Sequence, residues 1–536
     1  MEWAKAPEVR DQMVLFPQRL DDVIPIDHNV RLMDDILSRL DWSKWEAAYD
    51  LRRGQPPIPP RVIASVILYG NLTRIRSSRK LEEALQIRLD FRWLVEGRTI
   101  DHTTISNFRR SNADALRDTF VQMGMLARQL GWMTLEVLAF DGTRVRASNR
   151  RRGSRTPDEL RKMKEELAAK FKELEAKAAA ADSADEEVLG GTDNETQTDE
   201  LKHELADVRR RRARVDAALA ELDRAEKAGE TIPSRVPMTD VQSRVTPNKE
   251  GGFAPNFTPL AAVDVASGMI AAPDVIAGTD EDKHLIAAIE SVQKQFGLAA
   301  PPSTVLADGM MSSGENLSEC QARGIDLYSP IAMEIDPDNP ALRSDPTQPV
   351  PAELIDRLPT GSVKRNGKKV TQFTKQAFVY NKEHDCYYCP QGKMLSFSGT
   401  STETRAGGTK IERRRFKATD ADCQGCPLLV MCVAGQAKQR TLSREPHEEV
   451  RAAHARKMAT DAAQEIYAGR RHPGERPFAV IKQTFGARSF LLRGLKNVQQ
   501  EWRWLTSSFN LDRLMSLMRS RAGPEVANLV AHSHPP

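Results

Sequence analysis

The sequence lacks any long hydrophobic run. No stretch of about 18 uninterrupted apolar residues occurs in its 536 residues, which excludes a typical transmembrane helix. The opening stretch MEWAKAPEVRDQMVLF has no apolar core of the kind that defines a secretory signal peptide. A phosphate-binding loop of the pattern GxxxxGK(S/T) is also missing, so ATP dependence is not expected. We predict a cytoplasmic protein of about two to four domains.

Net charge is small as well. At +4 it argues only weakly for an anionic partner. The distribution of charge says more, because basic residues gather in two places. DGTRVRASNRRRGSR (141–155) holds six arginines, and KIERRRFK (410–417) holds five basic residues.

Cysteine is scarce, and six in the whole chain exclude a secreted disulfide framework. Five of the six cluster in CYYCPQGK, with Cys386 and Cys389, and in CQGCPLLVMC, with Cys423, Cys426 and Cys432. Two CxxC units at this separation form a zinc-ribbon-like pattern. Tetrahedral zinc takes four ligands, so one cysteine is spare, and spacing alone favours Cys386 over Cys432 as a ligand. The alternative is a set of unligated thiols in a reducing compartment.

Residues 1–134 have the pattern of helices. Hydrophobic side chains recur three and four residues apart in NVRLMDDILSRLDW and PRVIASVILYGNLTRI. Further on, Asp101 or Thr103 can cap an amphipathic helix that carries the paired arginines Arg109 and Arg110. Such a basic helix fits a DNA-binding domain, and it fits equally well a packing or dimerisation module. We predict an all-helical N-terminal domain of one of these kinds.

The rest of the chain predicts an α/β fold, a mixed sheet with flanking helices. Short apolar runs alternate with amphipathic segments over 135–333. Strong helix formers with frequent charge pairs interrupt them at 156–230, which predicts an inserted antiparallel helical hairpin. Residues 334–440 are polar and rich in Pro and Gly, and we interpret them as a Cys-rich, zinc-binding insertion. Helical periodicity resumes over 441–522, and 523–536 is expected to be a flexible tail.

Two aspartates stand where an apolar run ends. Asp141 follows VLAF, Asp308 follows TVLA, and a glycine comes after each. Groups at strand ends emerge at the rim of an α/β sheet, where ligands bind, although Asp-Gly alone often marks a turn. Glu475 follows HPG, which is expected to break a helix, and precedes Pro477, so we place it at the N-terminal end of the next helix. Lys482 should lie on the same face two turns later.

Three carboxylates from distant parts of the chain can hold hard cations such as Mg²⁺ or Mn²⁺. Two such ions about 3.5–4 Å apart activate the attacking oxygen and stabilise the leaving one in phosphodiester cleavage. Asp264, Asp280 and Glu465 are competing carboxylates. Asp264 lies in the middle of an apolar run, and we expect it to have a structural role.

Several stretches carry a family resemblance: LEVLAFDGTRVRASNRR, GGFAPNFTPLAAVDVASGMI, VLADGMMSSGENL and GERPFAVIKQTFGARSFLLRGLKNVQQEW. With LFPQRLDDVIPIDHNVRLMDDIL and DHTTISNFRR, they resemble bacterial insertion-sequence transposases of the DDE class over most of the chain apart from the helical hairpin. One branch of that class has a Tyr-Arg-Glu-Lys signature around its last acidic residue. This sequence offers Tyr467, Arg471, Glu475 and Lys482, with Arg470 as the alternative arginine because the first gap is one residue longer than usual.

The resemblance implies an RNase H-like core in which Asp141, Asp308 and Glu475 bind Mg²⁺ or Mn²⁺. It implies metal-dependent cleavage of DNA at the ends of a mobile element and joining of the freed 3′ hydroxyl to a target. The partner is then double-stranded DNA, both terminal repeats and target, in the bacterial cytoplasm and nucleoid. At least a dimer is expected, because two element ends must be brought together. The residues expected to touch DNA are Arg109, Arg110, Arg144, Arg146, Arg471 and Lys482.

The resemblance also bears on the cysteines and leaves other functions open. It favours Cys389, Cys423, Cys426 and Cys432 as zinc ligands, which makes Cys386 the spare. Two alternative functions stay open: a non-catalytic DNA-binding protein derived from a transposase, and a metal-dependent nuclease that does not join strands. Trp502 and Trp504 could stack on a flipped base, but their helical spacing with Leu505 and Phe509 favours core packing.

Overall fold

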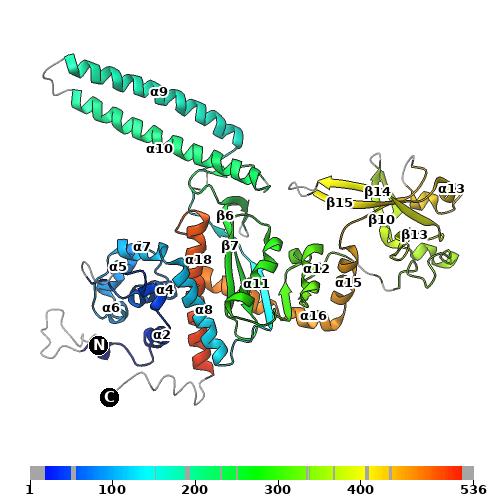
Figure 1. Ribbon diagram of the computed structural model, residues 1–536, viewed down its shortest axis with the longest axis horizontal. Helices are drawn as coiled ribbons and strands as arrows, with labels where there is room; N and C mark the ends of the chain where they lie inside the picture. Colours follow the sequence, from blue (N-terminus) through cyan, green and yellow to red (C-terminus); the bar gives the residue numbers. More distant parts are fainter. Residues whose placement is uncertain are drawn as a thin grey trace, which may run out of the picture. The chain divides into compact units, whose positions relative to one another are not determined.

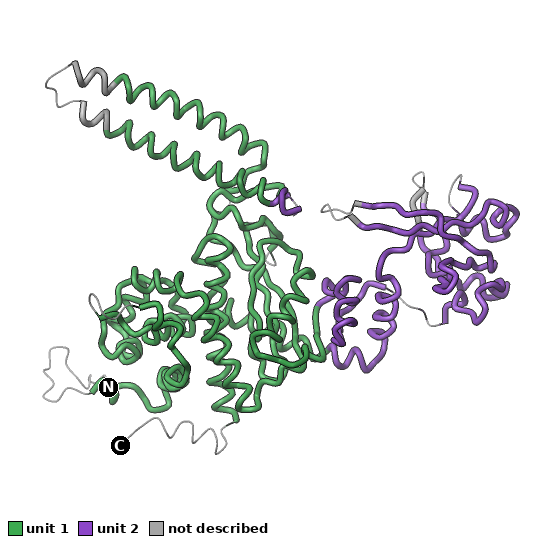
Figure 2. The backbone as a smooth tube through the Cα atoms, in the orientation of Figure 1, with its two compact units in different colours: residues 1–224, 233–307, 468–536 green, residues 225–232, 308–467 purple. Residues whose placement is uncertain are grey.

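The computed structural model describes residues 19–49, 56–150, 153–187, 194–229, 232–248, 251–333, 336, 338–365, 368–404, 410–433 and 437–521. The chain divides into two compact units (Figure 2). Unit 1 comprises residues 1–224, 233–307 and 468–536, and unit 2 comprises 225–232 and 308–467. The fold is mixed α/β with a mixed sheet and a helical N-terminal region, which confirms the predicted class. None of the helices in the described ranges combines the length and the hydropathy needed to span a membrane.

The N-terminal region of unit 1 is helical, as predicted. Its helices are α1 (Leu20–Val23), α2 (Asn29–Ser38), α3 (Ser43–Glu46), α4 (Pro60–Leu72), α5 (Ser78–Ile87), α6 (Leu89–Leu94), α7 (His102–Arg110) and α8 (Ala113–Gln129). α4 starts with proline in its first turn, where no N–H is needed, and is buried along nearly its whole length. Of the two predicted caps for α7, Asp101 is the one used: it accepts the N–H groups of Thr103 and Thr104.

The sheet of unit 1 is built around one long strand. Its strands are β1 (Val137–Gly142), β2 (Val145–Arg146), β5 (Arg244–Pro247), β6 (Phe253–Asp264), β7 (Ile270–Ile276) and β8 (Thr304–Ala307). β6 is buried from its second residue on and pairs antiparallel with β1, β2, β5 and β7, whereas β8 pairs parallel with β1. β1, β7 and β8 therefore all run in one direction, and their carboxyl ends lie at the same edge of the sheet. Ligands bind at such an edge in α/β proteins.

Helix α18 (Leu495–Ser520) packs between this sheet and the N-terminal helices (Figure 1). The Asn510 amide bonds both the N–H and the C=O of Ile270 at 2.8 Å, which attaches the helix to β7. On the other side, the Ser508 hydroxyl accepts a hydrogen bond from the side-chain amide of Asn71 in α4 at 3.0 Å. α18 is buried on nearly all sides in its central turns, which explains why its apolar residues show no single stripe.

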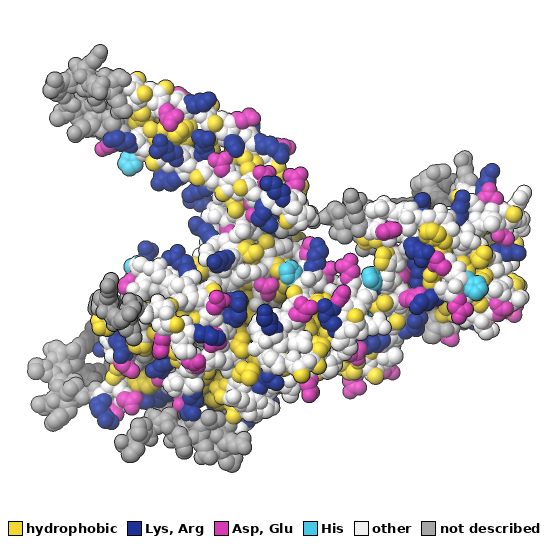
Figure 3. All heavy atoms as spheres, viewed as in Figure 1, with side chains coloured by type: hydrophobic (Ala, Val, Ile, Leu, Met, Phe, Trp, Pro, Cys, Tyr) yellow, Lys and Arg dark blue, Asp and Glu magenta, His cyan; other side chains and the backbone are white. Residues whose placement is uncertain are grey.

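The inserted hairpin consists of α9 (Pro157–Glu187) and α10 (Asn194–Lys227), with β3 (Ser154–Arg155) and β4 (Val236–Pro237) paired at its base. Leu160, Val215, Ala218 and Leu222 form its small core. Two ion pairs bridge the helices, Lys164 with Asp216 at 3.2 Å and Lys170 with Glu204 at 2.7 Å. Basic and acidic side chains are interspersed on the face of the hairpin in Figure 3, so it does not present a field of one sign.

Unit 2 contains a second sheet that the sequence does not predict. Its antiparallel strands follow in the order β12 (Val379–Asn381), β13 (Cys386–Tyr388), β14 (Met394–Thr404), β15 (Lys410–Lys417) and β16 (Thr441–Arg444). Tyr387, Leu395, Phe416 and Leu442 form its core with residues of a separate hairpin, β10 (Thr360–Arg365) and β11 (Lys368–Phe373). The polar, Pro- and Gly-rich composition of residues 334–440 does not indicate this core, because a few aromatic residues on short strands suffice to build it.

Helices complete unit 2. They are α12 (Gly314–Ala322), the short α13 (Asp420–Cys423) and α14 (Leu429–Cys432), α15 (Glu448–Met458) and α16 (Asp461–Ala468). α12 packs against α15, and β9 (Asp326–Tyr328) lies between them in the chain. His454 of α15 is buried and its Nε2 contacts the Ser329 carbonyl at 2.8 Å.

Candidate active site

Asp141 lies at the carboxyl end of β1, where Arg470 holds its carboxylate. Arg470 Nη2 is 3.2 Å from Asp141 Oδ1, and the two side chains are only 14% and 15% exposed. The same oxygen accepts the Gly142 N–H at 2.9 Å. Gly474 faces the carboxylate from the next helix, because a Cβ built there would lie 3.8 Å from Asp141 Oδ2. The Asp141 carboxylate is therefore fixed between β1 and the segment that carries Glu475.

That segment forms helix α17 (Arg471–Ala479), which differs from the prediction. HPG does not break the helix, because Pro473 and Gly474 lie inside it. Proline is tolerated in a first turn, where its missing N–H would have no partner, and the Gly474 N–H bonds the Arg470 carbonyl at 2.9 Å. Glu475 therefore lies exposed in the second turn instead of at the N-terminal end of the helix.

The helix continues into a π-helical turn, η5 (Val480–Thr484), which carries Lys482. Lys482 Nζ donates to the Thr143 hydroxyl, two residues after Asp141. Arg471, by contrast, is exposed. Of the two arginines considered for the signature, Arg470 is thus the one in contact with Asp141. The α17–η5 segment brings two cationic side chains, Arg470 and Lys482, to the end of β1.

Asp308 directly follows β8. β8 is the parallel neighbour of β1, and Ala307 pairs with Phe140, so Asp141 and Asp308 are the next residues along two adjacent strands. Asp308 Oδ1 accepts the Met310 N–H at 2.9 Å and caps a short 3₁₀ turn. The Asp-Gly pair after β8 therefore forms a turn and stands at a strand end at the same time.

Within the described ranges, no group of three or more His, Cys, Asp or Glu side chains is arranged to hold a metal ion. The register of β1 and β8 places Asp141 and Asp308 at adjacent strand ends, and Glu475 points outward from α17. Carboxylate oxygens at one rim nevertheless fit a hard cation, because Mg²⁺ is usually held by one or two carboxylates and completes its shell with water and phosphate oxygens.

The competing carboxylates have other surroundings. Asp264 is fully buried and accepts the Leu135 N–H at 2.8 Å and both the N–H and the hydroxyl of Ser267 at 2.8 and 2.6 Å. Burial raises the pKa of Asp264, which these hydrogen bonds oppose. Asp264 thus ties the turn after β6 to the start of β1. Asp280 and Glu465 are exposed, and Asp280 pairs with Lys283 at 2.8 Å.

One acidic residue that the sequence reasoning missed lies beside β1. Glu281 is only 7% exposed, and its carboxylate faces Gly142. It belongs to the acidic run Asp280–Asp282, shortly after the apolar run that forms β7. An acidic residue soon after a strand is the same pattern that identifies Asp141 and Asp308, so the sequence did contain the information.

Arg109 differs from the other basic residues predicted to contact DNA. It is 7% exposed, its Nη1 donates to the Arg76 carbonyl at 2.8 Å, and desolvation lowers its pKa. The apolar face of α7, with Ile105 and Phe108, carries Arg109 inward. Arg110 and Arg471 are exposed, and Arg144 and Arg146 are half-buried.

The cysteine cluster lies in unit 2 at the edge of its core. Burial raises the pKa of the Cys432 thiol to about 12; Arg440 opposes this, and the nearby Cys389, Cys423 and Cys426 add to it. The Cys389 sulfur also accepts the Lys393 N–H at 3.3 Å. The Cys386 thiol instead bonds the Tyr388 side chain. Cys389, Cys423, Cys426 and Cys432 are thus close enough to affect one another electrostatically, but in the described part of the chain no three of them are arranged to hold a metal ion.

The two tryptophans are core residues, as their spacing predicts. Trp502 and Trp504 are each 1% exposed. Trp502 Nε1 donates to the Leu260 carbonyl at 3.3 Å, and Trp504 Nε1 donates to the Arg109 carbonyl at 3.1 Å. Both indole N–H groups thereby have partners inside unit 1. Because the two rings are buried, they are not accessible to a base.

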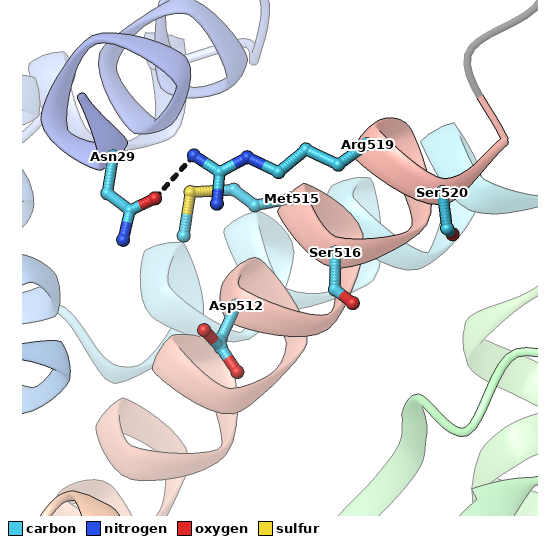
Figure 4. Close-up of a pocket in the computed structure, with 6 residues that line it drawn as sticks. All are labelled: Asn29, Asp512, Met515, Ser516, Arg519 and Ser520. Atoms are coloured by element: carbon cyan, nitrogen blue, oxygen red, sulfur yellow. Dashed lines mark hydrogen bonds between the residues drawn. The ribbon is translucent and has the colours of Figure 1, made fainter. Parts of the chain in front are cut away.

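A hollow at the end of α18 contains none of the predicted site residues. It is lined by Asn29, Asp512, Met515, Ser516, Arg519 and Ser520 (Figure 4). Arg519 donates to the Asn29 side chain and thereby joins α18 to the start of α2. This hollow belongs to the packing of the helices.

Two protein-family models match the chain. A transposase DDE domain matches residues 388–515, and a transposase domain of the DUF772 type matches residues 18–111. These matches indicate an insertion-sequence transposase of the DDE class. Comparison with curated proteins finds no match. The DDE match contains Glu475, Lys482 and the clustered cysteines from Cys389 on, whereas the other match ends just after α7.

Proposed function

We propose that this transposase cuts DNA at the ends of a mobile element and joins the freed 3′ ends to a target, with Asp141, Asp308 and Glu475 as ligands of Mg²⁺ or Mn²⁺. The observation that carries the proposal is the pairing of Phe140 with Ala307, which puts the two aspartates at adjacent strand ends. The DDE match over α17 adds Glu475. Oxygen ligands at a sheet edge are what a hard cation requires.

The side chains around Asp141 have roles that follow from their contacts. Arg470 fixes the Asp141 carboxylate against α17, and Lys482 is held at Thr143. With cations bound, the site would activate the attacking oxygen and stabilise the leaving oxygen. The positive charges of Arg470 and Lys482 would then lie next to the phosphates that flank the cut.

An RNase H-like core is part of the proposal. Three neighbouring strands of the sheet support it: β6 pairs antiparallel with both β1 and β7, β8 pairs parallel with β1, and α17 and α18 pack on the sheet. The proposed core joins residues 135–333 to 441–522 and is interrupted by the hairpin at 156–230 and the Cys-rich segment at 334–440. Residues 1–134 serve DNA binding or assembly.

A structural zinc ion held by Cys389, Cys423, Cys426 and Cys432 is a further part of the proposal. Cys423 and Cys426 lie close enough to raise the pKa of both Cys389 and Cys432, and this proximity supports the proposal. The Lys393 N–H that bonds the Cys389 sulfur supports it as well, because such a hydrogen bond favours a thiolate. Zinc would anchor the short helices α13 and α14 to the turn after β13. Its role would be structural, because four protein ligands leave no open position.

The proposed DNA contacts come from exposed or half-exposed basic residues. They are Arg110, Arg144, Arg146, Arg471 and Lys482. In unit 2, β15 adds Arg415 and Lys417, which are exposed and point to the same side of the strand. Arg109 is left out because it is buried. A dimer or larger assembly is proposed, since two element ends must be cut together, and the protein would act on chromosomal DNA in the cytoplasm.

The test is an excision and joining assay on a plasmid that carries the gene with its native flanking DNA. Wild type is compared with Asp141→Ala, Asp308→Ala and Glu475→Ala, and Glu465→Ala is the matched control because it removes an exposed carboxylate from α16. We expect discrete excised and joined products with Mg²⁺ for wild type and the control, and no detectable products for the other three, because each of them removes a proposed metal ligand.

Other outcomes separate the alternatives. Shifted DNA in a gel without any cut, for wild type in Mg²⁺ or Mn²⁺, contradicts catalysis and favours a DNA-binding protein. Cut ends that never join to a target favour a nuclease. Full activity of Asp308→Ala would refute the assigned ligand set.

A further inference from the structure

A cavity of about 460 Å³ lies beside β7, an edge strand of the sheet in unit 1. Helices α11 (Leu285–Gln295) and α18 both pack against β7, and α8 packs against α18 (Figure 1). All three helices contribute to the walls of the cavity, and all of its lining residues belong to unit 1. Its volume lies in the range of sites that hold small organic molecules, about 300–1,000 Å³.

Each of the three helices contributes one cationic side chain to the cavity. These are Arg117 of α8, Lys294 of α11 and Arg503 of α18. Asp274 of β7 is the acidic residue in the lining, so three positive charges and one negative charge leave +2 when His284 is neutral. Like charges that are brought together repel one another unless an anion neutralises them. The cavity therefore has the charge of an anion site.

Arg503 is the cation whose charge is least compensated. It is half-buried, and in the described ranges its side chain forms no hydrogen bond or ion pair. Burial lowers the pKa of Arg503, the positive charge of Arg117 adds to the shift, and Asp274 and Asp114 oppose it. Both carboxylates have other partners: Asp114 pairs with Arg117 at 3.4 Å, and Asp274 Oδ1 accepts the Gln499 amide at 3.2 Å. A guanidinium in these surroundings can bind an anion through several N–H groups.

Apolar walls distinguish the cavity from a site for a simple ion. Pro273 of β7, Ala287 and Ala288 of α11 and the buried Phe140 of β1 line it beside the cations. An inorganic ion alone would leave this apolar surface in contact with water. An apolar wall next to clustered cations fits an anion that carries an organic group. A nucleotide has this chemistry, because its phosphate is anionic and its base has a flat apolar face.

We propose that this cavity binds a nucleotide, with its phosphate at Arg503, Arg117 and Lys294 and its sugar or base on the apolar wall. The nucleotide is either part of a DNA strand or a free mononucleotide, since both present the same groups. The inference goes beyond the proposed function, because none of the proposed metal ligands is among the described residues that line the cavity.

The experiment measures binding of deoxyadenosine monophosphate to the full-length protein by isothermal titration calorimetry, with deoxyadenosine as the probe that lacks the phosphate. Arg503→Gln should weaken binding about tenfold or more, because it removes charge-assisted hydrogen bonds. Ala287→Trp should abolish binding, because the indole fills the cavity while every charge is kept. Ala287 is exposed, so α11 tolerates this change. Lys496→Gln is the matched control, because it removes an exposed positive charge of α18 that does not line the cavity, and it should bind like wild type.

A second titration, with a DNA duplex in excess, separates the two sources of the nucleotide. Loss of mononucleotide binding, together with weaker duplex binding by Ala287→Trp, assigns the cavity to a DNA strand, whereas undiminished mononucleotide binding assigns it to a free nucleotide. The inference is overturned if wild type does not bind the mononucleotide or binds deoxyadenosine equally well. It is also overturned by wild-type affinity in a folded Arg503→Gln or Ala287→Trp. Asp308→Ala should bind the mononucleotide like wild type, so failure of the proposed metal site and failure of this cavity are distinguishable.

Discussion

Arg470 Nη2 lies 3.2 Å from Asp141 Oδ1, and each side chain is about 15% exposed, whereas the adjacent Arg471 is fully on the surface. The ion pair joins the N-cap residue of α17 to the end of β1. Because the pair is largely shielded from water, removing one partner leaves a costly charge behind. Two neighbouring arginines that look equivalent in the sequence therefore have different roles.

The first prediction distinguishes these two arginines. Arg470→Gln should lower DNA cleavage about a hundredfold, because Asp141 loses the group that fixes it and small misplacements of a reacting group have effects of that size. Arg471→Gln should change cleavage only a few-fold. Cleavage rates on an end-containing oligonucleotide duplex, measured at equal protein concentration, provide the comparison. Equal losses for both variants would contradict the assignment.

The second prediction concerns zinc. Cys432→Ser should reduce bound zinc from about one ion per chain to near zero and lower the melting temperature, whereas Cys386→Ser should keep both. Burial raises the pKa of the Cys432 thiol to about 12, so at neutral pH this thiol loses its proton only when a metal binds. Zinc affinity should therefore fall as the pH is lowered. Metal analysis of the purified protein with and without chelator measures these effects, and zinc retained by Cys432→Ser would refute the ligand set.

The third prediction uses the exposed basic side of β15. Replacing both Arg415 and Lys417 by Glu, which reverses their charge, should weaken DNA binding for specific and unrelated sequences alike. The dependence of log K on log salt should also become shallower, by about one for each phosphate that the variant no longer neutralises. The matched control reverses Lys162 and Lys177, which are exposed on α9 of the hairpin. Fluorescence anisotropy at several salt concentrations measures the DNA-binding constant and its dependence on salt. An unchanged salt slope in the β15 variant would exclude this strand from the DNA interface.

The fourth prediction is a dependence of stability on pH that originates at His454. Burial lowers the pKa of His454, its bond to the Ser329 carbonyl and Asp326 oppose the shift, and Lys457 adds to it. The histidine is then neutral in the fold, while in the unfolded chain it takes up a proton near pH 6.5. Its contribution is present above that pH and is lost as the pH falls below it. Unfolding midpoints at pH 7.5 and 5.5 should differ less for His454→Gln than for wild type, and an equal difference would contradict the prediction.

Much of this architecture can be predicted from local patterns. The three- and four-residue spacing of apolar side chains predicts α2 and α4, and it predicts that the two tryptophans of α18 lie in the core. The place before an amphipathic run predicts Asp101 or Thr103 as the cap of α7, and the structure uses Asp101. These features depend on neighbours within a few residues, which the sequence displays directly.

Other features depend on partners far away in the chain. Arg109 looks like a surface charge until α18 covers it, and HPG looks like a helix break until Gly474 is seen against Asp141. The position of Glu281 beside Gly142 can be recognised only when β7 is known to run beside β6 in the direction of β1. The small core of unit 2 likewise comes from residues on several short strands, none of which has enough apolar residues to stand out alone.

Helix α18 links the two regions that match transposase families. Glu501 of α18 forms a buried ion pair with Arg76 at 2.6 Å, and Gln500 donates to the Ser111 carbonyl at 2.7 Å. The N-terminal helices and the last helix of the DDE region therefore share one interior. An exchange of N-terminal modules between related elements would leave Glu501 buried without its arginine, at a cost of about 3–5 kcal/mol. Related proteins that keep this contact should consequently inherit the N-terminal helices and α18 together, as one recombination unit.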